Sequence, residues 1–283
     1  MRWRGRTQSG NVEDGRGLRV GRGAVGGGIG AIALALVAMY FGVDPSVVMQ
    51  LAGGGGGETV TEGPINETAQ EAEMREFVSV VLNETEIAWG EEFAAMRGEY
   101  RKPKLRLFRD AVQSACGTAD SAVGPFYCPP DERVFLDLSF FNDMATQLQA
   151  GGDFAYAYVI AHEVGHHVQN LLGISGRVQE MRQRVGEVES NQLSVRIELQ
   201  ADCFAGLWGH HAEKAGILEP GDIDEALTAA AAIGDDRLQR NAGRSVVPDS
   251  FTHGTSEQRS RWFHRGFETG SVEACDTFKS ADL

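Results

Sequence analysis

The segment that most constrains how this chain can fold is Tyr158-Val-Ile-Ala-His162-Glu163-Val-Gly-His166-His167. A helix turns about 100° per residue, so His166 lies about 40° round from His162 and one turn further along. Two imidazoles placed in this way can reach one metal ion. Glu163 lies beside them, where it can act on a water molecule without binding the metal. The spacing predicts a helix from Phe154 to about Leu172.

The rest of this helix has the pattern of a buried one. Its apolar residues cluster opposite the two histidines: Ala157, Ile160, Val164, Val168 and Leu171. Such a helix packs its back against a core and presents the imidazoles to a cleft. A bare H-E-x-x-H can arise by chance, and histidines on a helix are more often surface or core residues than ligands. Further features must therefore decide.

A second helix, predicted from about Ser190 to Lys214, carries Glu198 and Asp202 on one face. We predict that Glu198 completes a His-His-Glu metal set, and that Asp202 accepts a hydrogen bond from the other nitrogen of a ligand histidine. A solvated acidic helix face is the alternative. The H-E-x-x-H pattern about 30 residues upstream favours the metal site.

Three protein ligands leave a fourth position for water, which is typical of catalytic zinc. We expect one Zn²⁺ to activate water, Glu163 to take the proton as general base, and a polypeptide to be the substrate. Structural zinc is disfavoured because such sites usually have four protein ligands. A membrane-tethered binding or scaffold protein without catalytic turnover remains the alternative, although no ligand or base is missing.

Four cysteines, Cys116, Cys128, Cys203 and Cys275, allow three disulfide pairings. Cys116 and Cys128 flank a short loop, so we favour a local pair, which leaves Cys203 to bond Cys275. A four-cysteine zinc site is disfavoured because the chain has no C-x-x-C knuckle.

The N-terminal region differs in charge from the rest of the chain. The formal net charge is -14, yet residues 1–23 carry six arginines against two acidic residues. The acidic remainder repels phosphate backbones, so nucleic-acid binding is not expected.

Residues 24–43 contain no charged side chain and are long enough to cross a bilayer as a helix. The basic flank before them predicts a cytoplasmic tail at 1–23 and an extracytoplasmic domain after them, in a single-pass protein of the bacterial cytoplasmic membrane. A cleaved signal peptide is the alternative, disfavoured by the length of the apolar run.

Residues 44–70 contain five consecutive glycines and are predicted to be a linker, so the folded domain occupies 71–283. A helix should open it near Glu71, because apolar residues recur at helical spacing: Phe77, Val80, Val81, Ile87, Ala88 and Trp89. Lys104–Phe108 and Val134–Leu138 are predicted strands. Another helix is expected from Asp222 to about Gln239.

Motifs spread along the chain resemble those of the bacterial neutral zinc metallopeptidase family with membrane-anchored N-termini. They are the Met1-Arg-Trp-Arg-Gly start, Ala122–Cys128, His162–His166, Glu198–Cys203, His253–Arg259 and Cys275–Phe278. The pairing of H-E-x-x-H with E-x-x-x-D is also similar to the gluzincin class. This resemblance implies a mainly helical α+β fold, in which two motif helices lie beneath a small sheet whose edge strand docks an extended substrate.

His253 and Arg259 lie in a polar segment and are candidates for stabilising the oxyanion of a tetrahedral intermediate. The alternative is a structural role at the start of the next helix, where Thr255 or Ser256 could be the N-cap. We assign no function to His210, His211 and His264.

Overall fold

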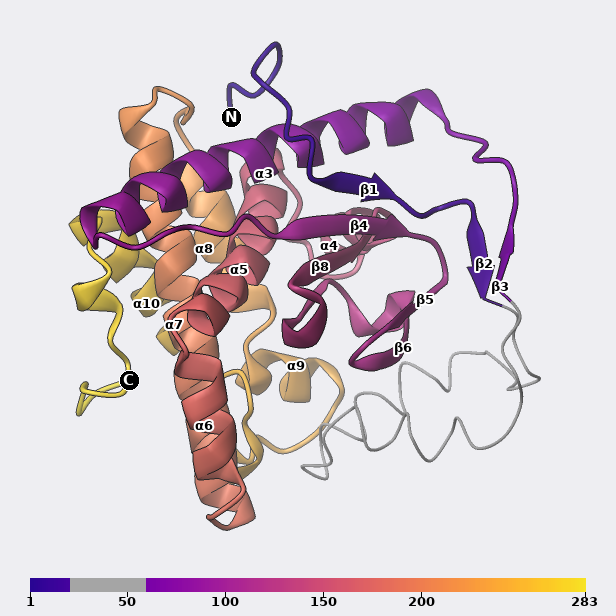
Figure 1. Cartoon of the computed structure of the whole chain (residues 1–283). Coiled ribbons are helices and arrows are strands. Elements are labelled where there is room, and N and C mark those ends of the chain that lie inside the picture. The colour runs from indigo at the N-terminus through magenta and orange to yellow at the C-terminus, as the bar shows by residue number, and fades with distance from the viewer. Residues whose placement is uncertain (21–59) are drawn as a thin grey trace.

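A small sheet lies beside a bundle of helices, and one long helix, α3, runs across both (Figure 1). The computed structural model describes residues 1–20 and 60–283. Within them the fold is of the α+β class, as predicted.

The sheet has the strand order β1-β4-β8-β7. β1 (Val12–Asp14), β4 (Lys104–Phe108) and β8 (Arg133–Asp137) are parallel, whereas β7 (Phe126–Cys128) pairs with β8 in the antiparallel direction and forms one edge. The two predicted strands are confirmed as β4 and β8, the second shifted by one residue.

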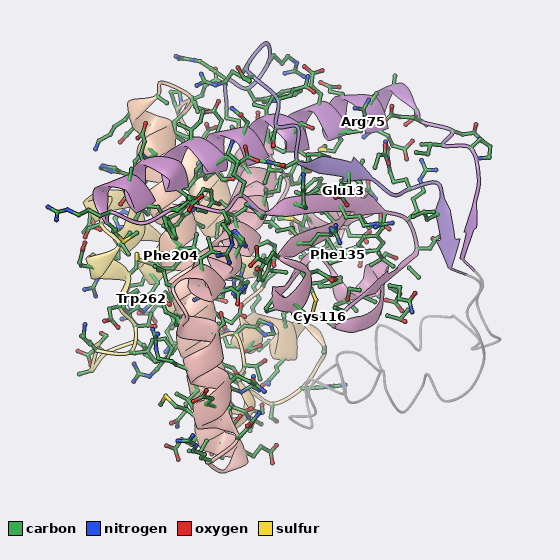
Figure 2. All side chains as sticks on the ribbon, viewed as in Figure 1. Glu13, Arg75, Cys116, Phe135, Phe204 and Trp262 are labelled. Carbon is green, nitrogen blue, oxygen red and sulfur yellow. A yellow bond between two sulfur atoms is a disulfide. The ribbon has the colours of Figure 1, made fainter. Side chains whose placement is uncertain are left out.

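Side chains along each strand point alternately to the two faces of the sheet, and both faces are covered. Leu105, Leu107, Val134 and Leu136 enter the main core with the helices. Phe108 and Phe135 point the other way, into a smaller cluster beneath the hairpin of β5 (Ala111–Ser114) and β6 (Gly117–Asp120). Figure 2 shows Phe135 in this region.

Helix α3 (Ala69–Ala95) begins at a capping box, in which Thr68 accepts from the Glu71 N–H and Glu71 accepts from the Thr68 N–H. The predicted start near Glu71 is therefore confirmed within two residues. Most of the predicted apolar face is buried, including Phe77, Val80 and Trp89, but Ile87 is half exposed.

The bundle consists mainly of α5 (Asp153–Leu171), α7 (Glu187–Lys214), α8 (Asp222–Ala232) and α10 (Ser256–Thr269). Its core contains Phe204 of α7 and Trp262 of α10, both labelled in Figure 2. The remaining elements are β2 (Leu18–Val20), β3 (Val60–Glu62), α4 (Ser139–Thr146), α6 (Ile174–Arg182), α9 (Asp235–Asn241) and the short 3-10 helices Ser121–Val123, Pro129–Asp131, Pro248–Ser250 and Glu273–Cys275.

The single helix predicted from Asp222 to Gln239 is wrong, because α8 ends at Ala232 and α9 begins at Asp235. Gly234 separates them. A Cβ atom at Gly234 would overlap the backbone of Ser256, so the chain turns at the point where α10 begins.

Residues 1–20 are part of this fold, which corrects the predicted cytoplasmic tail. Met1 and Trp3 are buried in the main core, and the Met1 α-amino group lies 2.8 Å from Asp153 Oδ1 at the start of α5. β1 joins the sheet, and β2 pairs with β3. Residues 60–62, predicted as linker, are therefore also structured.

The predicted single-pass membrane localisation is corrected as well. The described residues contain no helix that is both long and apolar enough to cross a membrane, and the predicted span at 24–43 lies outside them.

The favoured disulfide pairing is confirmed: Cys116 bonds Cys128, and Cys203 bonds Cys275. The first bond ties the β5–β6 hairpin to the end of edge strand β7. The second ties α7 to the C-terminal segment and is fully buried.

Helices α7 and α10 make backbone contact through glycine. A Cβ atom at Gly206 would overlap the carbonyl oxygen of Phe263, and one at Gly266 would overlap the carbonyl oxygen of Cys203. Only residues without a side chain allow this approach.

We expect Gly206→Ala to lower the free energy of unfolding by about 1–3 kcal/mol or more, because the added methyl group must push two helix backbones apart. Gly90→Ala is the control: the position lies inside α3 with nothing within 4 Å of an added Cβ, so the change should stabilise by roughly 0.5–1 kcal/mol. Denaturant unfolding of both variants measures the difference. Equal effects would contradict the backbone contact.

Candidate metal centre

Helix α5 supplies His162 and His166 from a face that is turned toward α7, with Glu163 beside them. Its opposite side is buried as predicted, with Ala157, Ile160, Val164 and Val168 almost completely inaccessible. The apolar back fixes the rotation of the helix. The two histidines therefore face α7.

The structure brings His162, His166 and Glu198 together. The Nε2 atoms of the two histidines lie 3.2 Å apart, and Glu198 Oε2 lies 3.2 Å from His162 Nε2. Glu198 Oε1 is 3.5 Å from His166 Nε2. Zinc–ligand distances of about 2.0–2.2 Å in a tetrahedron place neighbouring donor atoms about 3.3 Å apart, so two imidazole nitrogens and a carboxylate at these separations could hold one zinc ion.

Hydrogen bonds on the far side of each imidazole fix its orientation. His162 Nδ1 lies 2.8 Å from Asp202 Oδ1, and since a carboxylate only accepts, Nδ1 carries the proton. His166 Nδ1 lies 2.9 Å from Gln169 Oε1. The Gln169 amide nitrogen donates to the Ile197 carbonyl, which leaves its oxygen to accept from His166.

The centre requires a positive charge between its three groups. Burial lowers the pKa of His166, so its Nε2 offers a lone pair toward His162 and Glu198. Burial also opposes a charge on His162, but Asp202 and Glu198 outweigh it and raise its pKa to about 10. A proton on His162 or a divalent cation can supply this positive charge. Two imidazole nitrogens and one carboxylate form a donor set that zinc prefers.

Asp202 is completely buried and contacts three groups. Its Oδ1 accepts from the Tyr158 hydroxyl at 2.6 Å as well as from His162. Arg259 donates through Nε to Oδ2 and through Nη2 to Oδ1, each at 2.9 Å. Burial alone would raise the pKa of Asp202, but Arg259 and His162 lower it to about 2.

Arg259 therefore lies behind His162, on the side of Nδ1 rather than of the metal-facing Nε2. It is 2% exposed, and its guanidinium is committed to Asp202, Tyr158 and the Ile233 carbonyl. This position does not support the predicted oxyanion role.

His253 is held differently. Asp235 accepts hydrogen bonds from the backbone N–H groups of Thr252, His253 and Gly254, and its Oδ1 lies 3.2 Å from His253 Nδ1. Because Nδ1 is bonded to Asp235, Nε2 is the ring nitrogen that can hydrogen-bond a bound molecule. Burial lowers the pKa of His253, but Asp235 and Glu198 raise it above its usual value. Thr255 is the N-cap of α10, so this segment also has the predicted capping role.

Glu163 is 8% exposed and is not one of the converging ligands. Burial raises the pKa of Glu163 to about 7, against the opposing effects of His162 and of the Tyr127 backbone N–H on edge strand β7. Glu163 lies four residues before His167, whose ring bonds Tyr127 of edge strand β7, so the general-base candidate is on the side of α5 that is turned toward the sheet.

Sequence reasoning missed several residues that hold these groups. Tyr158, Gln169 and Asn170 share the histidine face of α5, at intervals of three or four residues from His162 and His166, so the helical spacing could have indicated them. Asp235 and Tyr127 lie far away in sequence, and no local pattern identifies them.

A second acidic cluster, Asp153, Asp222 and Glu225, has a composition compatible with a metal site. Two of its members, Asp153 and Asp222, hold the Met1 α-amino group instead. His210, His211 and His264 lie apart from the metal centre and bond Phe267, Glu92 and Glu268.

The chain is similar to known proteins over nearly its whole length. Residues 1–278 match a protein family described as "Putative neutral zinc metallopeptidase". "Uncharacterized protein YpfJ" of Escherichia coli K12 is 49% identical over 291 residues, covering 98% of this chain and 99% of that protein. "Uncharacterized protein Rv2575" of Mycobacterium tuberculosis is 42% identical over 258 residues, covering 87% and 86%. No solved structure matches the chain.

We expect Asp202→Asn to weaken zinc binding by about 10-fold to 100-fold, because it removes the carboxylate that orients His162 and increases its basicity. Competition with a chromophoric chelator measures the affinity. Asp143→Asn, a change at a partly exposed position on α4, is the control and should leave the affinity unchanged. Wild-type affinity in folded Asp202→Asn would contradict this role.

Proposed function

This chain belongs to the neutral zinc metallopeptidase family, and we propose that it is an endopeptidase that hydrolyses peptide bonds with Glu163 as general base. The observation that carries the proposal is the convergence of three metal-binding side chains from α5 and α7, with a buried carboxylate beside them. His166 and Glu198 remain 17% and 19% exposed, so solvent can approach the centre.

His162, His166 and Glu198 would hold the zinc ion. The chemistry that zinc supplies in such a site is a lowered pKa of water, to about 7, and polarisation of the substrate carbonyl. Glu163 takes the proton of the attacking water and returns it to the leaving amine when the peptide bond breaks. Its pKa near 7 suits both transfers.

Edge strand β7 is the proposed docking site for the substrate backbone. It pairs with β8 on one side only, so its other side offers backbone N–H and C=O groups to an extended peptide. Tyr127 of β7 bonds His167 of α5, which follows Glu163 by one helical turn, so a peptide paired with β7 would pass close to the general base. This arrangement agrees with the gluzincin-like organisation that the two helix motifs imply.

His253 is the proposed oxyanion stabiliser. Its Nδ1 is bonded to Asp235, and its charge interacts with that of Glu198. A protonated imidazole in this position can donate from Nε2 to the oxygen that becomes negative during attack.

We expect Glu163→Gln to reduce cleavage of an unfolded protein by about 100-fold to 10,000-fold while zinc binding is retained, because only proton transfer is lost. His162→Ala should lose both. Zinc content is measured on the same samples by atomic emission. A chelator should abolish wild-type activity, and added zinc should restore it.

Full proteolysis by purified Glu163→Gln would contradict the general-base assignment. A zinc-loaded wild-type protein that cleaves no peptide would instead favour the binding or scaffold alternative.

For His253→Ala we expect kcat to fall about 100-fold to 1,000-fold with little change in KM, because the lost interaction forms only in the transition state. His210→Ala is the matched control, since His210 bonds the Phe267 carbonyl away from the centre. Steady-state kinetics on a fluorogenic peptide separates the two constants. A change confined to KM would exclude the oxyanion role.

A further inference from the structure

Tyr127 connects edge strand β7 to helix α5 by its side chain. Its hydroxyl lies 2.9 Å from His167 Nδ1 and accepts a hydrogen bond from the Asn170 side chain at 3.1 Å. Glu163 lies four residues before His167 on α5, so the two side chains share one side of that helix. One residue of a three-residue strand thus contacts α5 on the side that carries the general base.

The direction of the Tyr127–His167 bond follows from the other side of the ring. His167 Nε2 lies 2.6 Å from the Arg101 carbonyl oxygen, which can only accept, so Nε2 carries the proton. Nδ1 is then the acceptor, and the Tyr127 hydroxyl donates to it. His167 is completely buried, so a lost partner at Nδ1 cannot be replaced by bulk water.

The other attachments of β7 lead mainly to the sheet. It pairs with β8 through three residue pairs, the Phe126 ring stacks on Phe135, and the Cys116–Cys128 disulfide joins its end to the β5–β6 hairpin. Toward α5 the strand is held by the contacts of Tyr127 with His167 and Asn170, and directly after the strand Asn170 also donates to the Pro129 carbonyl at 3.5 Å.

We propose that Tyr127 and His167 are positioning residues that hold strand β7 against α5, in the register that presents a bound peptide to Glu163. The proposal rests on the proposed peptidase function. His167 directly follows the ligand His166 but faces away from the metal centre, toward the sheet. The two adjacent histidines therefore serve two different partners: the metal and the strand that binds the substrate.

The decisive comparison is between two tyrosines that both contact the His167 ring. Tyr100 lies 5.9 Å from it by ring centroids, but its buried hydroxyl makes no hydrogen bond within the described part of the chain. Tyr127→Phe and Tyr100→Phe each remove one hydroxyl group beside the same imidazole. Only the first removes the proposed bond.

We expect Tyr127→Phe to raise KM for a peptide of eight residues about fivefold to tenfold, with kcat and zinc content little changed, because a hydrogen bond that orders the strand is lost. A blocked dipeptide, too short to pair along β7, should be cleaved at the wild-type rate. Tyr100→Phe should behave as wild type with both substrates. A purely stabilising bond would instead leave KM unchanged or affect both peptides equally, and either result would overturn the proposal.

His167→Phe keeps a ring at this position and removes the acceptor. Adding Tyr127→Phe to it should cause no further rise in KM, because the two side chains act through one bond. Independent, multiplying effects would overturn the proposal.

Hydrogen exchange tests the strand itself without requiring activity. The amides of residues 126–128 should exchange faster in Tyr127→Phe than in Tyr100→Phe, and unchanged exchange would overturn the proposal even if the enzyme is active. If wild-type protein cleaves neither peptide although these amides respond as expected, the proposed function fails and the holding of β7 by α5 stands.

Discussion

The buried ion pair between Asp202 and Arg259 is the interaction on which the metal centre depends. Removing two charges from water costs several kcal/mol for each, and only good geometry with further hydrogen bonds compensates for it. Here the guanidinium donates twice to the carboxylate, while His162 and Tyr158 use its remaining acceptor capacity. The pair therefore fixes the ring of a metal ligand as well as the packing of α7 on α10.

The same pair links the metal centre to the loop that carries His253. Arg259 lies in the first turn of α10, and this helix begins directly after the segment from His253 to Thr255. Gly206 and Gly266 allow the two helices to approach at backbone distance nearby. A shift of α10 would thus move His253 and disturb the Arg259 contacts of Asp202 together.

The other side of the centre is built from the sheet. Strand β7 is joined to α5 through the Tyr127 side chain, which bonds His167 one turn after Glu163. In the proposed function, helices supply the metal ligands, whose positions demand rigidity, whereas a strand edge supplies backbone groups that can bind peptides of varied sequence. That function would divide chemistry and substrate alignment between the helices and the sheet.

The sequence by itself determined the features that follow from local periodicity. The 3.6-residue repeat placed His162, Glu163 and His166 on one face of a helix and Glu198 and Asp202 on one face of another, and alternation located β4 and β8.

Only the tertiary structure decided which groups meet across the chain. Nothing local indicates that Arg259 lies behind His162, that Tyr127 bonds His167, or that residues 1–20 pack into the domain. An apolar segment with a basic flank indicates which environment that segment prefers. It does not indicate which residues pair before and after it, and here β2 pairs with β3. The side-chain pattern determines which residues share one face of a helix or strand. The packing of the whole chain determines what that face contacts.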